Sequence, residues 1–264
     1  MPDPSPEHLD KEQAKRLAAV LNAGSEALFQ FILDTDQTIL QTLLHNPNLG
    51  DDHLIALLKR RDLPEEIPKR IYQLRQGNIA HPLLLSLAKN PSTPGSLVRN
   101  LLPRLRLFEL VAICYMPGVT PDQKLAAERA ILLRLPTMPL GNKITLARRA
   151  TPAVVGAIMK EGDPRTLDAC LNNPRLKEAA VYQFVSGAQA TASTISMVAR
   201  HSRWQQRPNL RLAILKNRQT PEIWYTLWLP KLSIGILNQL LATRRLSHVQ
   251  KKLIQRELQR RGLK

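Results

Sequence analysis

Residues 84–102 read LLSLAKNPSTPGSLVRNLL, two apolar segments on either side of a turn that contains Asn, Ser, Thr and two Pro. The leucines recur at helical spacing before and after the turn. Asn90 tolerates the left-handed conformation that often ends a helix, and Pro91 cannot continue that helix. Thr93 can cap the following helix, with Pro94 at its first position. The stretch therefore predicts two helices that a tight turn packs against each other.

Turns of the same kind recur along the chain at unequal intervals. They begin near Asn46, Pro117, Arg148, Asn173 and Asn217, with a degenerate copy near Thr243. The two longest intervals between turns leave room for an extra helix, around 64–74 and around 192–201. Helices joined by such short turns pack on their neighbours in sequence, which is how a solenoid buries its core. We therefore expect an all-α fold, a single α-solenoid of about 14–17 short helices.

The Asn-Pro-x-Thr-Pro turn resembles that of the variant leucine-rich repeat, and the helical pattern more loosely resembles HEAT repeats. The resemblance covers residues 37–260 and is best at 84–102, 143–160, 167–186 and 210–229. It implies a right-handed superhelix in which α-helices alternate with short 3₁₀ helices. Some members of that family hold an iron–sulfur cluster on an N-terminal group of cysteines. This chain has no such group, so no cofactor is expected, and scaffolds of this kind do not by themselves indicate a partner.

The chain of 264 residues has 38 Lys and Arg against 21 Asp and Glu, a formal net charge of +17. The net charge is −4 over residues 1–36, +8 over 37–194 and +13 over 195–264. We expect residues 1–36 to form an acidic helical cap and residues 37–264 the solenoid, with a strongly basic C-terminal third. The acidic segment could instead dock on the basic part of a neighbouring molecule, and the oligomeric state stays open.

Helices are also expected at both ends of the chain. The apolar spacing predicts one helix over 6–23 and a continuation over 24–45. Residues 244–261 predict an amphipathic helix. Its apolar side comprises Val249, Leu253, Ile254 and Leu258, and its other side is basic.

Basic side chains recur at or beside the turns, where a solenoid would align them along one edge. Trp204 lies between two arginines in a polar connector and is the best candidate for stacking on a base. The predicted nucleic-acid-binding residues are Lys89, Arg148, Arg149, Arg175, Arg203, Trp204, Arg207, Lys216, Arg218, Arg244, Arg245, Lys251, Lys252 and Arg256. The simpler interpretation of the turn cations is that they stabilise helix C-termini, because cations favour that end of the helix dipole.

Four further residues fall on core positions of the repeat and are predicted to be buried, although three of them are aromatic. They are Trp224, Tyr225, Trp228 and Leu229. Cys114 and Cys170 are likewise expected in the core as small apolar residues. The histidines have no carboxylate or thiol at ligand spacing, so no metal site is expected.

No nucleotide-binding, zinc-protease or nucleophile-elbow motif is present in the sequence. A minor alternative is an enzyme similar to the alkylpurine-type DNA glycosylases, which are small basic helical-repeat proteins; Asp168 would then be its carboxylate. The sequence has no secretory signal and no membrane span, so a cytoplasmic location is expected. The favoured hypothesis is a non-catalytic scaffold that binds nucleic acid, DNA or RNA, through its basic edge. The alternative is a protein-interaction scaffold that binds an acidic protein segment.

Overall fold

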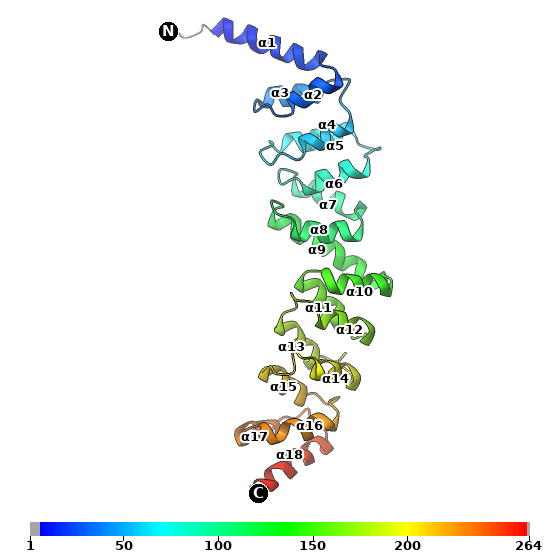
Figure 1. Cartoon of the computed structure of the whole chain (residues 1–264), viewed down its shortest axis with the longest axis vertical. Coiled ribbons are helices and arrows are strands. Elements are labelled where there is room, and N and C mark those ends of the chain that lie inside the picture. Colours follow the sequence, from blue (N-terminus) through cyan, green and yellow to red (C-terminus); the bar gives the residue numbers. More distant parts are fainter. Residues whose placement is uncertain (1–5, 263–264) are drawn as a thin grey trace. The chain divides into compact units, whose positions relative to one another are not determined.

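A computed structural model describes the backbone of residues 6–262 and the side chains of residues 11–262. This part of the chain is all-helical, with eighteen α-helices, three short 3₁₀ helices (η) and no strand (Figure 1). The all-α prediction is therefore confirmed. The expected alternation of α-helices with 3₁₀ helices is not seen, since the three 3₁₀ helices each extend the end of an α-helix, at α7, α9 and α16.

Contacts divide the chain into two compact units, Met1–Ile131 and Leu132–Lys264. The first unit contains α1 (Pro6–Asn22), α2 (Ser25–Phe31), α3 (Gln37–Leu43), α4 (Asp51–Leu57), α5 (Glu66–Leu74), α6 (His81–Lys89), α7 (Gly95–Leu101), η1 (Leu102–Arg104), α8 (Leu107–Tyr115) and most of α9 (Pro121–Arg134). The predicted boundary after residue 36 falls inside this unit, where α1 packs against α3. The extra helix expected around 64–74 is confirmed as α5.

The second unit begins within the last turn of α9. It contains η2 (Leu135–Thr137), α10 (Leu140–Arg149), α11 (Pro152–Lys160), α12 (Pro164–Leu171), α13 (Glu178–Ser186), α14 (Ala192–Arg200), α15 (Pro208–Leu215), α16 (Glu222–Trp228), η3 (Leu229–Lys231), α17 (Ile234–Leu241) and α18 (His248–Arg260). The extra helix expected around 192–201 is confirmed as α14. In both units a helix packs mainly on the next helix and the one after it, the local packing that a solenoid requires.

The second unit repeats the first at one constant offset in the sequence. The helices α7, α8 and α9 begin at Gly95, Leu107 and Pro121, and α16, α17 and α18 begin with the same spacing at Glu222, Ile234 and His248. The 3₁₀ helices η1 and η3 correspond in the same way and share the sequence Leu-Pro-basic. The unequal intervals between turns are therefore the spacing of one long unit that occurs twice.

Ion pairs and caps are repeated as well. Arg16 pairs with Asp34 at 2.6 Å, and Lys143 pairs with Glu161, at the equivalent positions, at 2.7 Å. Asp36 accepts a hydrogen bond from the backbone N–H two residues later and caps α3, and Asp163 caps α12 in the same way. Because an ungapped offset aligns both the sequence and these contacts, the chain is a tandem duplication.

Four asparagines in the turns form side-chain hydrogen bonds that reach back to earlier helices. These turn asparagines are Asn46, Asn90, Asn173 and Asn217, two in each unit. Each Nδ2 donates to backbone carbonyls that end a helix far earlier in the sequence. Asn90 donates to Leu58 and Arg60 at 2.8 Å each, and Asn217 donates to Val185, the counterpart of Leu58, at 2.6 Å.

The other pair of turn asparagines forms the same kind of bond. Asn46 donates to Val20 and Ala23 at 2.7 and 3.0 Å, and Asn173 donates to Ala147, the counterpart of Val20, at 2.7 Å. Each Oδ1 accepts from the N–H two residues later and closes the turn. The amides thus join consecutive helical repeats and satisfy carbonyls that would otherwise be buried without a partner.

A buried glutamine extends this network in each unit. Gln123 lies in the first turn of α9, and its Nε2 donates to the backbone carbonyl of Asn90 at 2.6 Å. Its counterpart Gln250, in the first turn of α18, donates to the carbonyls of Asn217 and Thr220 at 3.3 and 3.1 Å. Both side chains are 3% exposed, which is rare for glutamine unless it is fully hydrogen-bonded.

The structure corrects the local chemistry expected at the turns. No residue other than glycine has a positive φ in the described chain, so the asparagines do not end helices in the left-handed conformation. Thr93 does not cap α7; its hydroxyl donates back to the carbonyl of Leu87 at 2.7 Å. Thr220 donates in the same way to Ile214. The expected Thr cap before Pro is present at Thr120, whose Oγ1 accepts from Gln123 N at 3.2 Å.

Two predicted helices have different limits. Residues 24–45 form α2 and α3 rather than one helix, because Asp36 caps a new helix after the turn at 32–35. The C-terminal helix begins at His248 rather than at 244, with Ser247 as its cap, so that Arg244 and Arg245 lie in the preceding turn. Val249 is 50% exposed because Gln250 takes the buried position beside it. Within the described residues, no helix has the length and apolar character needed to cross a membrane.

Replacing a turn asparagine should destabilise the protein. We expect Asn90→Ala to lower the free energy of unfolding by about 1–3 kcal/mol, because it leaves buried carbonyls without a donor. Urea denaturation followed by circular dichroism measures this. The matched control is Asn100→Ala, an exposed asparagine on α7 of the same unit, which should change stability little. Equal effects of the two substitutions would contradict the role given to Asn90.

Candidate anion-binding groove

A groove of about 940 Å³ opens on the second unit between the C-terminal end of α13, the end of α15 and the turn that joins α17 to α18. We call it the basic groove. Its thirteen lining residues are Tyr182, Ser186, Gly187, Ala188, Ala190, Ala213, Lys216, Asn217, Arg218, Gln219, Thr243, Arg244 and Arg245. None of them is acidic, and four are cations.

The four cations come from two turns that the fold brings together. Lys216 ends α15 and Arg218 follows in the same turn as Asn217. Arg244 and Arg245 lie in the turn before α18. Asn217 and Gln250 hold the two turns against each other, since Gln250 Nε2 donates to the backbone carbonyl of Arg218 at 3.1 Å. The buried amide network therefore positions the charged side chains.

These cations have no compensating charge within the structure. No carboxylate among the described residues forms an ion pair with Lys216, Arg218, Arg244 or Arg245. Lys216 is half-buried and the three arginines are exposed. Like charges gathered in one concavity repel each other and attract an anion, and the field is stronger in a concave surface than on a flat one. The positive charge of the groove therefore favours anions over cations.

An arginine crosses the corresponding place in the first unit. Arg61 stands where the second unit has Ala188, and its Nη2 donates to the carbonyl of Pro117 at 3.2 Å. Its guanidinium lies so close to Gly118 that a Cβ there would clash with it, and Gly118 has a φ of +80°. The arginine therefore spans from the α4–α5 turn to the α8–α9 turn. Ala188 is too short to do so, which leaves the groove open in the second unit.

The three exposed arginines that line the groove, which we call the rim residues, replace uncharged residues of the first unit. Pro91, Pro117 and Gly118 of the first unit correspond to Arg218, Arg244 and Arg245. In the preceding turn, the pair Arg60-Arg61 corresponds to Gly187-Ala188. Arg60 is structural, because its Nη1 donates to the carbonyls of Ile32 and Asp34. The first unit therefore has cations in the α4–α5 turn and neutral residues at the rim positions, whereas the second unit has neutral residues in the α13–α14 turn and cations at the rim positions.

Four of the predicted binding residues line the basic groove, and the others do not. Arg148 and Arg149 are exposed at the end of α10, and Lys251, Lys252 and Arg256 lie on α18. Lys89 ends α6 in the first unit. Arg175 already interacts with another residue of the chain. The Nε atom of Arg207 lies 3.8 Å from Oε2 of Glu178. None of these residues lines the basic groove, and their alignment along one edge stays a prediction.

The prediction that Trp204 stacks on bases is wrong. The side chain is 2% exposed, and its Nε1 donates to the carbonyl of Leu171 at 3.1 Å, so that the indole packs into the core beside α12. Arg203 covers the ring at 4.4 Å from its centroid. The Arg203 guanidinium donates to the carbonyls of Asn173 and Leu176, so these donors are used within the fold.

The predicted core residues are confirmed. Trp224, Trp228 and Leu229 are each at most 7% exposed, and Tyr225 is fully buried. Burial raises the pKa of the Tyr225 hydroxyl, which donates to the carbonyl of Leu215.

Two further kinds of side chain could carry chemistry, an exposed carboxylate and a group of metal ligands. Asp168 is exposed in the second turn of α12 and accepts a hydrogen bond from Asn172 Nδ2 at 3.2 Å. It does not line the basic groove. No group of three or more His, Cys, Asp or Glu side chains comes together in the described part of the chain.

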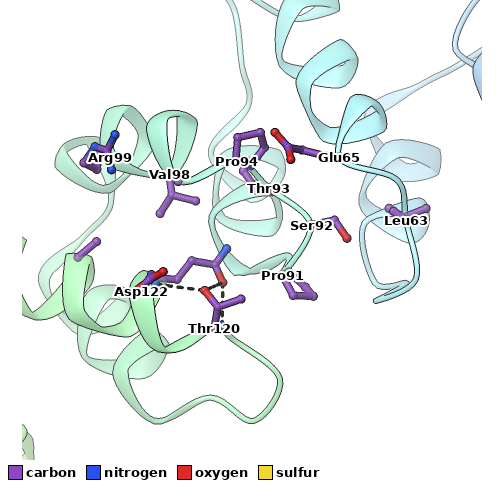
Figure 2. Close-up of a pocket in the computed structure, with 13 residues that line it drawn as sticks. Leu63, Glu65, Pro91, Ser92, Thr93, Pro94, Val98, Arg99, Thr120 and Asp122 are labelled. Atoms are coloured by element: carbon purple, nitrogen blue, oxygen red, sulfur yellow. Dashed lines mark hydrogen bonds between the residues drawn. The ribbon is translucent and has the colours of Figure 1, made fainter.

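A second hollow, of about 450 Å³, lies in the first unit (Figure 2). Figure 2 shows the Pro91–Pro94 turn on one side and Thr120 and Asp122 at the start of α9 on the other. Its charged lining residues are Glu65, Arg99 and Asp122, two acids and one base. This mixed lining gives no preference for an anion, in contrast to the basic groove.

Sequence reasoning missed Tyr182, which lines the basic groove and is 46% exposed. Its counterpart in the first unit is Ile55. It also missed the opening created by Gly187-Ala188. Aligning the second half of the sequence with the first, without gaps, reveals both differences.

Comparison of the chain with protein-family models, with curated protein sequences and with solved structures finds no match.

Both thiols should be unreactive in the folded protein. Cys114 and Cys170 are buried, and burial raises their pKa values to about 11 and about 12. At pH 8 only about one Cys114 thiol in a thousand is then ionised, and the thiolate is the reactive form. We expect an aromatic disulfide reagent to modify neither cysteine in native protein and both in urea. Rapid modification of native protein would contradict their placement in the core.

Proposed function

We propose that the protein binds a polyanion, a nucleic-acid backbone, in the basic groove of the second unit, and that it does so without catalysis. The observation that supports the proposal best is the convergence of four uncompensated cations on one concavity with no acidic lining residue. Phosphates spaced along a nucleic acid offer several negative charges to such a surface at once.

The chemistry of the four cations fits phosphate. Arg218, Arg244 and Arg245 each present a planar fork of N–H donors that can bond two oxygens of one phosphate. Lys216, which is half-buried, adds a point charge. Binding displaces counterions condensed on the nucleic acid, so affinity must fall as salt rises. Contacts of this kind carry little sequence information, so sequence preference should be weak.

The contrast between the units supports binding in the groove rather than on any basic surface. Basic residues also occur on α10 and α18, where helix-end stabilisation and solvation account for them. At the basic groove, the second unit has Ala188 where Arg61 crosses the first unit. The groove and its rim changed together, which is the pattern expected if one copy acquired a ligand.

Neutralising the rim should weaken binding specifically. For Arg244→Gln with Arg245→Gln, we expect the slope of log affinity against log salt, measured by fluorescence anisotropy with a single-stranded oligonucleotide, to become shallower by about 1.4, or 0.7 per lost phosphate contact. The control is Arg148→Gln with Arg149→Gln, which removes the same charge from the end of α10. The proposal fails if wild-type protein binds neither DNA nor RNA at about 50 mM salt, or if both double variants weaken binding equally.

Filling the groove without changing charge separates groove binding from general attraction. Ala188→Leu should reduce affinity about tenfold or more by placing a side chain where Arg61 lies in the first unit. The control is Gln189→Leu, a substitution in the same turn at an exposed position that does not line the groove. Unchanged affinity in Ala188→Leu would mean that the ligand contacts a surface other than the groove. Capture of an acidic peptide in place of nucleic acid would favour a protein-interaction scaffold.

A further inference from the structure

The aromatic residues of the second unit divide sharply by exposure. Five of the six are buried: Phe184, Trp204, Trp224, Tyr225 and Trp228 are each at most 7% exposed. The sixth, Tyr182, is 46% exposed. An aromatic ring contributes most to stability when it is buried, so one left half-exposed in an otherwise consistent core contributes little to the fold.

Tyr182 is exposed within the basic groove. It lies on α13 one turn before Ser186, and both residues line the groove wall opposite the turn cations. No hydrogen bond of its hydroxyl to another described residue is present. In the first unit the same position is Ile55, which is half-buried, and the facing space is crossed by Arg61. The ring and the opening are thus found together in one copy and are absent together in the other.

We propose that the basic groove takes single-stranded nucleic acid, with a base stacked on the ring of Tyr182 while its flanking phosphates contact Arg218, Arg244 and Arg245. The inference rests on the proposed function and adds the form of the nucleic acid. An aromatic ring beside a cationic track is the arrangement that binds single strands without sequence preference, because every base has a face that can stack.

A duplex cannot use this ring. Its bases are stacked on one another inside the helix, and extruding one requires unstacking and unpairing it. It can use only the phosphate contacts, which a single strand makes as well. The groove should therefore prefer a single strand to a duplex of equal length, and a strand with bases to a strand without them.

Three probes separate the contribution of the ring from that of the charges: a single-stranded oligothymidylate of about ten nucleotides, the corresponding duplex, and an abasic oligomer with the same phosphates. Wild-type protein should bind the oligothymidylate about 5- to 150-fold more tightly than the abasic strand. Tyr182→Leu should abolish this difference, with unchanged affinity for the abasic strand and an unchanged salt slope. Tyr182→Phe, which keeps an aromatic ring, should keep the difference in affinity between the two strands.

The ring's own optical signal gives a second readout. Stacking on a base should quench part of the tyrosine fluorescence of wild-type protein, and this quenching should be absent from Tyr182→Leu. Thermal unfolding of both Tyr182 variants should match wild type within a few degrees, because the side chain is exposed.

The outcomes distinguish the two proposals. Equal affinity of wild-type protein for the oligothymidylate and the abasic strand overturns the stacking inference and leaves phosphate binding standing. Equal loss of affinity for both strands in Tyr182→Leu means that the ring shapes the groove rather than stacking, which also overturns the inference. Failure of wild type to bind any of the three probes overturns the proposed function itself.

Discussion

The fold depends on buried amides that bond the carbonyls at the ends of earlier helices. A short helix leaves its last four carbonyls without intrahelical partners, and a chain of short helices buries many such ends. Here Asn90 and Asn217 reach back to Leu58 and Val185, far earlier in the sequence. Among the described residues, no buried side-chain nitrogen or oxygen lacks a partner. Each asparagine amide accepts a hydrogen bond within its own turn and donates hydrogen bonds to the previous repeat, so that it links consecutive repeats.

This constraint explains why the turns stayed alike while their neighbours diverged. The turn asparagines, the two glutamines and Thr93 with Thr220 keep their identity between the two units because they bond to backbone, which a side-chain change elsewhere does not remove. Neighbouring residues that are not buried, such as Pro91 and its counterpart Arg218, differ between the two units. The alanine at position 188, in place of Arg61, leaves the groove of the second unit open, and the arginines on the rim add positive charge to it. The hydrogen bonds of the turn amides are kept in both units.

Local patterns were enough to predict the helices, the turns and most of the core. The apolar spacing and the Asn-Pro and Thr-Pro pairs located the turns, and the alignment of Trp224 and Trp228 with leucines placed them in the core. Trp204 could not be placed in this way. It lies in a connector with no repeat offset, and its burial depends on Leu171, whose carbonyl becomes a neighbour only after the chain folds. The hydrogen bonds of the turn asparagines to earlier helices could not be predicted for the same reason. Their acceptor carbonyls, such as that of Leu58 for Asn90, also become neighbours only after the chain folds.

The candidate site was predicted only in part, because the pattern of charge along a sequence does not say which cations share a concavity. Lys216 and Arg218 come from one turn and Arg244 and Arg245 from another, and buried Gln250 holds the two turns together. The number of cations in the last quarter of the chain suggested a broad basic surface. In the structure four of these cations line one groove together with Tyr182, a residue that no charge count could indicate.

Hydrogen–deuterium exchange with a bound single-stranded oligonucleotide tests the central claim most directly, because it compares the two copies within one molecule. The account predicts slower exchange at 182–190, 213–219 and 243–246, and no change at the equivalent first-unit segments 55–63, 86–92 and 116–119. Equal protection of both copies, or protection confined to 248–260, would contradict the assignment of the ligand to the basic groove.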